Sequence, residues 1–198
     1  MQLLILARHG ESEYSARGLL NGDPSVAVGL TAAGEAQARA LGASLCETPM
    51  DICVTTEFGR TQRTAKLVLE GRDVPVEVWP DLNDPQAGSF EGLPIDAYLV
   101  WAGGAGSAEP MPGGGQSRQA IVARCARAYR ALLERPEPTI LAILHALPIA
   151  YLLSALEGTA PAARMGRVVE YAHAYPVRED ELRAAVEVLE RWCAAPSW

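Results

Sequence analysis

Two short, mostly apolar runs stand out along the chain, because each one stops abruptly at a histidine. Residues 3–7 (LLILA) are followed by Arg8 and His9, and residues 139–144 (TILAIL) are followed by His145. Runs of four to eight such residues that end in polar groups are typical of buried strands that lead into a loop. The pattern therefore predicts two central strands, each with an imidazole at its C-terminal end.

The rest of the chain alternates between helical periodicity and short β-branched runs. The helical pattern covers residues 31–45, 59–70, 95–101, 117–135, 148–156 and 179–195. Further strands are predicted at residues 51–55, 74–79 and 168–171, and Pro75 favours a place near the sheet edge for the second of these. Such alternation is typical of an α/β fold with a mostly parallel sheet covered by helices on both faces.

Residues 103–115 are the one compositionally biased segment, rich in glycine and proline. Irregular stretches of this length inside a compact domain usually have a function. We therefore predict a lid or specificity loop around residues 85–116. Because the 198 residues contain no repeat and no clear linker, we predict a single domain over residues 1–198.

Composition and charge limit the classes of partner that the protein is expected to bind. The net charge of −7 comes without any polybasic block, which argues against nucleic acid or an anionic membrane as partner. The four cysteines are dispersed and show no metal-ligand spacing, so reduced thiols, no metal and no cofactor are expected. No secretory leader or membrane span is recognisable, which makes the cytoplasm the expected location. A homodimer is compatible with the sequence.

The two predicted strand ends bring candidate chemistry together. If both strands are parallel and central, His9 and His145 lie at one edge of the sheet, where α/β folds bind ligands. An imidazole can ligate a metal, transfer protons or act as a nucleophile. Arg8 and Arg17 near His9 repel a metal and attract an anion, and Arg60 at a helix start adds a second anion-favouring feature. Arginines beside two histidines suggest phosphoryl transfer to a histidine.

Five short blocks follow one another in order over roughly residues 3–150. They are Arg8-His9-Gly10-Glu11-Ser12, LTAAGEAQA at 30–38, RTQRTA at 60–65, LNDPQAGSFEG at 82–92, and His145. In content and order they resemble the histidine phosphatase superfamily, the phosphoglycerate mutase-like group. The first block alone is weakly specific, whereas all of them in sequence are highly specific.

This resemblance implies a three-layer α/β/α sandwich and a two-step reaction. His9 would attack phosphorus to give a phosphohistidine, which water would then cleave. Arg8, Arg60 and His145 match the phosphate pocket of the family, and Asp84 falls where the family carries its proton donor. Such a donor must be protonated, so its pKa should be raised by burial or by the incoming phosphate.

Several positions depart from the family pattern. Asp84 replaces the commoner Glu, which shortens the acid by one methylene group. Ser15 stands where Asn is common, and Ala146 replaces the Gly that usually follows the second histidine. We keep Ser15, Asn21 and Ala146 as candidate phosphate- or substrate-binding residues. Arg17 is either a further phosphate contact or a solvated surface side chain.

The favoured function is that of a metal-independent phosphoric monoester hydrolase that acts on a small phosphorylated substrate. Two alternatives stay open: phosphoryl transfer of the phosphoglycerate mutase type, and a catalytically weakened phosphate-binding protein. The chain lacks a long insertion after Gly92, which favours the phosphatase. No residue pattern identifies the physiological substrate.

Overall fold

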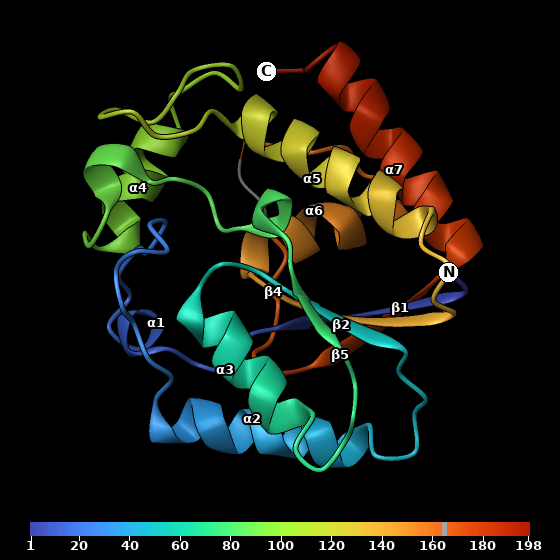
Figure 1. Cartoon of the computed structure of the whole chain (residues 1–198). Helices are drawn as coiled ribbons and strands as arrows, with labels where there is room; N and C mark the ends of the chain where they lie inside the picture. The colour runs from blue at the N-terminus through green and yellow to red at the C-terminus, as the bar shows by residue number, and fades with distance from the viewer. Residues whose placement is uncertain (164–165) are drawn as a thin grey trace.

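The computed structural model describes residues 1–163 and 166–198 and contains a five-stranded sheet. Its strands are β1 (Leu3–Arg8), β2 (Ile52–Thr55), β3 (Val76–Val78), β4 (Thr139–Leu144) and β5 (Ala174–Arg178). They lie in the order β3-β2-β4-β1-β5, and β5 alone is antiparallel to its neighbour. The sheet is therefore mixed but mostly parallel, with β1 and β4 side by side at its centre (Figure 1).

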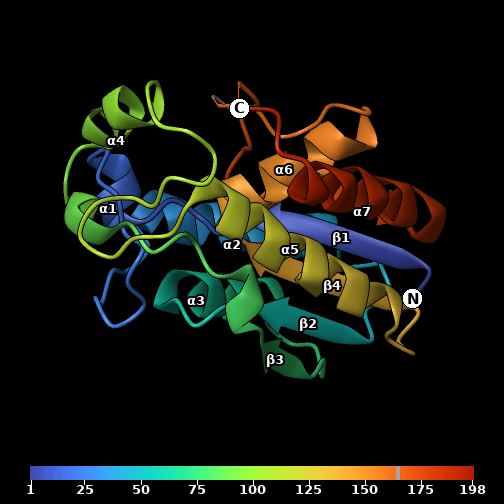
Figure 2. The same ribbon diagram turned by 90° about the horizontal axis from the view of Figure 1, so that it is seen from above.

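Helices cover both faces of this sheet. The helices are α1 (Glu13–Ala16), α2 (Ala32–Ser44), α3 (Gly59–Val68), α4 (Ile95–Ala102), α5 (Arg118–Leu133), α6 (Ala146–Leu156) and α7 (Glu179–Ala194), with 3-10 turns at Pro80–Leu82 and Gly88–Phe90. Helices α2 and α3 pack on one face, whereas α5, α6 and α7 pack on the other (Figures 1 and 2). This arrangement confirms the predicted three-layer α/β/α fold.

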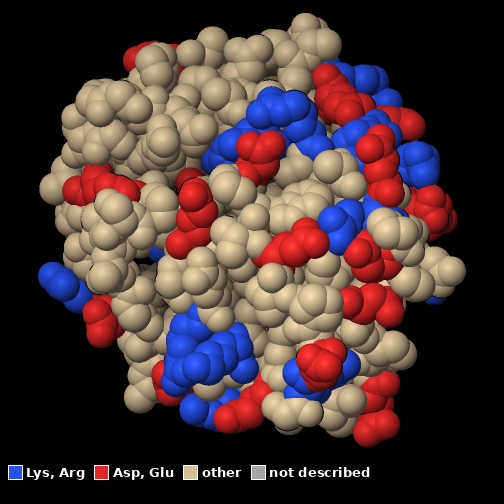
Figure 3. Space-filling view, viewed as in Figure 1, with Lys and Arg blue, Asp and Glu red and all other residues tan. Residues whose placement is uncertain are grey.

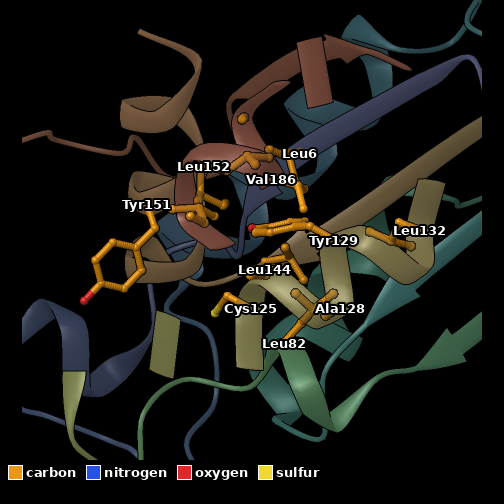
Figure 4. Packing of buried hydrophobic residues seen from close by; sticks show 14 of the residues in the cluster. Leu6, Leu82, Cys125, Ala128, Tyr129, Leu132, Leu144, Tyr151, Leu152 and Val186 are labelled. Carbon is orange, nitrogen blue, oxygen red and sulfur yellow. The ribbon is translucent and has the colours of Figure 1, made fainter. Parts of the chain in front are cut away.

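Strand β1 is apolar on both faces, because its successive side chains point alternately into the two cores. Leu4 and Leu6 point into a core formed with α5, α6 and α7, where Figure 4 shows Leu6 close to Tyr129. Ile5 and Ala7 point the opposite way, into the smaller core formed with α2 and α3. Because successive side chains alternate across a strand, a run without polar residues is what a doubly covered strand requires.

One predicted strand is wrong. Residues 168–171 form no strand, and their only pairing in the described structure is an isolated bridge between Tyr171 and Arg8. The fifth strand lies later, at Ala174–Arg178, and includes Pro176 opposite Ile5. A proline cannot donate to a sheet ladder but is tolerated on an edge strand, and β5 is such an edge. The proline is what made this segment a poor strand candidate.

One helix was not predicted, and another begins earlier than the sequence indicated. The short helix α1 was not predicted; it follows Ser12, whose side chain accepts a hydrogen bond from the backbone N–H of Ser15 and so caps it. Helix α6 begins at Ala146, directly after His145, and its Pro148 lies in the first turn, where a missing N–H costs nothing. Within residues 1–163 and 166–198, no helix is both long and apolar enough to cross a membrane.

The start of α2 packs directly against the loop that follows β1. A Cβ on Gly34 would lie 2.0 Å from the carbonyl oxygen of Glu11, and one on Gly10 would lie 2.3 Å from that of Gly34. Only two glycines allow the backbones to approach this closely. The loop that carries His9 is thus seated on α2 without intervening side chains.

We expect Gly34→Ala to destabilise the protein by roughly 1–3 kcal/mol, because the added methyl group forces the backbones apart. Alanine is the better helix former by about 1 kcal/mol, so the effect opposes intrinsic propensity. Chemical denaturation measures it. The matched control is Gly59→Ala in the first turn of α3, where an added Cβ would meet nothing within 4 Å. Equal stabilities of the two variants would show that the contact at Gly34 is not tight.

Candidate active site

His9 is buried immediately after β1, and its surroundings fix its tautomer. Its Nδ1 lies 2.7 Å from the carbonyl oxygen of Gly10, which can only accept, so Nδ1 carries the proton. Its Nε2 then has a free lone pair, which accepts a hydrogen bond of 3.1 Å from Nε of Arg60. Burial, reinforced by the charge of Arg60, holds the pKa of His9 well below 6.5. The imidazole is therefore neutral.

Arg60, in the first turn of α3, lies at the centre of the constellation and is only 3% exposed. Besides His9, its guanidinium donates to Oδ1 of Asn21. Its Nη2 donates to Oδ2 of Asp84 at 2.9 Å and to Nδ1 of His145 at 3.1 Å. One fixed positive charge therefore joins four of the residues that the sequence singled out.

His145 is fully buried after β4, and its ring centroid lies 5.4 Å from that of His9. Because arginine can only donate, Nδ1 of His145 is the acceptor toward Arg60 and Nε2 carries the proton. Nε2 donates to Oγ1 of Thr56 at 2.9 Å, and that hydroxyl lies 2.9 Å from Oγ1 of Thr61. Burial first, and then the charge of Arg60, lower the pKa of His145 well below its usual value.

Asp84 contacts both Arg60 and His145 from the cavity side of the site. Its Oδ2 lies 2.9 Å from Arg60 Nη2 and 3.4 Å from the unprotonated Nδ1 of His145. Burial raises the pKa of this carboxyl, although Arg60 and Arg8 oppose the shift. A proton on Oδ2 would also relieve the approach of two lone pairs at His145. The protonated form of Asp84 is therefore more favoured than that of an ordinary surface aspartate.

Arg8 ends β1 and is held in a fixed orientation. Its guanidinium carbon lies 3.7 Å from the ring centroid of Tyr171, and its Nη1 donates to the carbonyl oxygen of Val169 at 2.9 Å. Its buried Nε has no hydrogen-bond partner among the described residues. Arg8 also lines the cavity described below, so its guanidinium can donate to an anionic ligand there.

Asn21 is oriented by the carboxylate of Glu91, a residue of the fourth sequence block. Nδ2 of Asn21 donates to Oε1 of Glu91 at 3.0 Å, and Oε2 of Glu91 accepts from the N–H of Gly22 at 2.7 Å. These contacts turn the carbonyl oxygen of Asn21 toward Arg60. In the structure Asn21 contacts the arginine, and Glu91 acts through it.

Most of the predicted site residues line one cavity of about 870 Å³, whereas His145 is fully buried and does not line it. His9, Arg60, Asp84 and Arg8 face it, and so do Ser15, Asn21 and Ala146. Ser15 Oγ lies 2.9 Å from Oγ of Ser12 at the capped start of α1. Arg17 is exposed, with its guanidinium carbon 6.0 Å from the ring centroid of Tyr14. In the described part of the chain, no cluster of three or more His, Cys, Asp or Glu side chains could hold a metal ion.

Three residues at the site were missed by sequence reasoning. Thr56 directly follows β2, as His9 and His145 follow their strands, so a search for polar residues at strand ends would have found it. Glu91 lies inside a recognised block. Tyr171, under Arg8, lies in a segment without regular structure and gave no signal beyond its aromatic ring.

The arrangement joins the lone pair of a neutral imidazole to the buried guanidinium of Arg60, the half-buried guanidinium of Arg8 and a carboxyl with a raised pKa. Such a pocket attracts an oxyanion, and it offers one nucleophile and one proton donor. The cations would stabilise negative charge that develops on oxygen during phosphoryl transfer.

The chain belongs to the histidine phosphatase superfamily, branch 1, because the family model matches residues 4–190. Over 88 residues it is 42% identical to adenosylcobalamin/alpha-ribazole phosphatase of Salmonella typhimurium, a match that covers 44% of this chain and 43% of that protein. Over 136 residues it is 39% identical to a 2,3-bisphosphoglycerate-dependent phosphoglycerate mutase of a Methylobacterium species, with 62% and 64% covered. These matches span less than two thirds of either relative.

Solved structures are similar over a larger share of the chain. The crystal structure of a putative alpha-ribazole-5'-P phosphatase from Escherichia coli has a TM-score of 0.77 and 30% sequence identity. The superposition covers 89% of this chain and 90% of that one. Both comparisons agree with the α/β fold and with membership of a family of phosphatases and mutases.

Proposed function

We propose that the protein hydrolyses phosphomonoesters through a phosphohistidine on His9. The observation that carries this proposal is the fixed tautomer of His9: the carbonyl of Gly10 holds the Nδ1 proton, which leaves the Nε2 lone pair beside Arg60. A neutral, oriented imidazole is what in-line attack on phosphorus requires. Membership of the family supports the same reaction class.

In the first step, Nε2 of His9 forms a bond to phosphorus as the bond from phosphorus to the ester oxygen breaks. The guanidinium groups of Arg8 and Arg60 stabilise the charge on the transferred phosphoryl oxygens. The proton on Asp84 passes to the leaving alkoxide, so the alcohol departs neutral and Asp84 is left ionised. The raised pKa of Asp84 supports this role.

In the second step, water attacks the phosphohistidine. The carboxylate of Asp84 takes a proton from the water as the new phosphorus–oxygen bond forms and the phosphorus–nitrogen bond breaks. Inorganic phosphate leaves, and both His9 and Asp84 return to their starting states. The reaction as written consumes one water and requires no metal ion or cofactor.

We also propose that residues 85–116 form the substrate-side wall of the cavity. Pro85, Ala87, Met111 and several residues of α4 line it. The opposite walls come from residues 8–22, from residues 146–163 and from residues 166–171. This shared lining supports a single functional domain over residues 1–198.

Steady-state assays with a phosphomonoester in the presence and absence of EDTA test the proposal. We expect release of inorganic phosphate that is unaffected by the chelator. Loss of activity with EDTA would contradict the metal-independent reaction. Vanadate binding without any turnover would instead favour a weakened phosphate-binding protein. Similarity to the Methylobacterium mutase favours a second candidate function, interconversion of 2- and 3-phosphoglycerate primed by the bisphosphate, which releases no phosphate and is tested by separating the two isomers after incubation.

We expect Asp84→Asn to lower kcat for alkyl phosphates by about 10²–10⁴-fold, and to lower it much less for aryl phosphates, whose leaving groups need no proton. The pH profile provides a second readout. The acid form of Asp84 is the active one, so kcat/KM of the unaltered protein falls as the pH rises through the raised pKa. His9 must be neutral, and because its pKa lies well below 6.5, the acidic limb lies well below that pH.

In Asp84→Asn the alkaline limb assigned to this carboxyl should disappear. The matched control is Asp81→Asn, an exposed aspartate in the turn just before it. Equal losses of kcat for aryl and alkyl esters, with an unchanged alkaline limb, would show that Asp84 is not the proton donor.

A further inference from the structure

The cavity above His9 has a polar floor and largely apolar walls. The floor consists of the side chains of Arg8, His9, Arg60 and Asp84. The walls come from the loop after α1, from α4 and from α6, and include Leu19, Ile95, Leu99, Val100, Leu147 and Tyr151. A phosphate group accounts only for the floor, so the walls must serve another part of the ligand.

Helix α4 exposes more apolar surface than a helix of a water-facing layer normally does. Val100 is 80% exposed, Ile95 44% and Leu99 42%, and all three line the cavity. Figure 3 shows few charged atoms on the face that carries α4, at the upper left, whereas charges crowd the side that carries α7. An exposed apolar cluster that borders a ligand cavity marks a binding surface.

This wall is held in place rather than free to adapt. The ring of Trp101 lies 5.7 Å from that of Phe90 and 6.0 Å from that of Tyr98, between centroids. Buried Arg118 donates to the carbonyl oxygen of Ala102 at 2.8 Å and also to that of Ala105. A preformed wall binds an apolar group with little cost in ordering the protein.

We propose that the alcohol part of the substrate is an apolar group of about the size of an aromatic ring, which binds against α4 and α6. This inference rests on the proposed phosphatase function. The cavity of about 870 Å³ has the size of a pocket for a small organic molecule and far exceeds the volume of phosphate. Burial of apolar ligand surface on these walls supplies binding energy remote from the reacting bond.

The charged residues that line the cavity walls also favour an uncharged alcohol group. Asp96 of α4 lines the cavity and would repel an alcohol that carries a carboxylate. Two wall cations also line it, but the guanidinium of Arg167 is paired with Glu157, and both Nη atoms of Arg118 donate to backbone carbonyl oxygens. A sugar acid phosphate therefore fits these described walls less well than an uncharged apolar ester does.

A series of primary alkyl phosphates tests the proposal, since their leaving alcohols have similar pKa values and differ mainly in apolar size. We expect kcat/KM to rise about two- to fourfold per methylene group from ethyl to hexyl phosphate. We expect 2-phenylethyl phosphate to exceed glycerol 3-phosphate and 3-phosphoglycerate by at least about 30-fold.

A matched pair of variants ties this preference to α4. Val100→Ser should lower the ratio of kcat/KM for 2-phenylethyl to ethyl phosphate by at least about threefold. Val76→Ser should leave that ratio unchanged, because Val76 is 50% exposed on strand β3 and does not line the cavity. Thermal unfolding of both variants verifies that each one folds.

The two proposals fail in different ways. If none of the esters is hydrolysed, the phosphatase function itself is wrong. If they are hydrolysed with equal kcat/KM across the series, or if 3-phosphoglycerate is preferred, the apolar site is overturned and the phosphatase stands. A ratio that changes equally in Val100→Ser and Val76→Ser also overturns the apolar site.

Discussion

His9→Ala is expected to lower kcat by at least about 10⁴-fold, the order of loss that follows removal of a covalent nucleophile. The lone pair of Nε2, which lies 3.1 Å from Nε of Arg60, is the only feature of His9 that the reaction uses directly. The fold should persist, because the imidazole belongs to the cavity floor and not to either apolar core. Rapid quenching with ³²P-labelled substrate measures the covalent intermediate directly.

The unaltered protein should retain acid-labile, alkali-stable label, as phosphohistidine does, whereas His9→Ala should retain none. His173→Ala is the matched control, since His173 is exposed and its ring packs on Tyr175 at 4.8 Å between centroids, away from the cavity lining. A labelled His9→Ala protein, or one that turns over at the normal rate, would exclude His9 as the nucleophile.

Arg60→Ala is expected to lower kcat/KM by about 10²–10⁴-fold, because it removes a buried charge-assisted donor from the phosphoryl site. The same change should raise the pKa of His9, since the charge of Arg60 helps to hold that pKa down. The acidic limb of the pH profile should therefore move to higher pH. A purely structural role of Arg60 would not move this limb.

Arg60→Lys is expected to recover only part of the activity, because a lysine cannot reproduce the planar fork that contacts His9, His145 and Asp84 together. Arg63→Ala is the matched control one turn further along α3. Arg63 is partly exposed and pairs with Glu35, and such surface pairs contribute at most about 1 kcal/mol. If both alanine variants lose equal activity, the effect arises from α3 as a whole and not from the guanidinium of Arg60.

Much of the site was predictable from the ends of two strands. The apolar run of β1 placed Arg8 and His9, and that of β4 placed His145, because parallel neighbouring strands end at one edge of a sheet. Arg60 followed from its position at the start of a helix. These predictions rest on local patterns, so they needed no knowledge of long-range contacts.

The contacts that complete the site could not be predicted from the sequence, because they join segments that are distant along the chain. Tyr171 supports Arg8 through a segment without regular structure, and Thr56 supports His145 across strands. The fifth strand was predicted at the wrong residues for two reasons. Its partner, β1, lies at the far end of the chain, and Pro176 makes the segment look unlike a strand, although an edge strand tolerates it. Such features depend on tertiary neighbours, which neither propensity nor periodicity records.

The order of strands in the sheet has a consequence for how the chain is made on the ribosome. Strand β1 emerges first, yet both of its neighbours come from the last third of the chain, β4 at residues 139–144 and β5 at residues 174–178. Its two edges stay unpaired until those segments have been synthesised, and unpaired apolar strands invite aggregation. The nascent chain thus carries its candidate nucleophile long before it can assemble the pocket, and completion of the sheet is also the step that assembles the site.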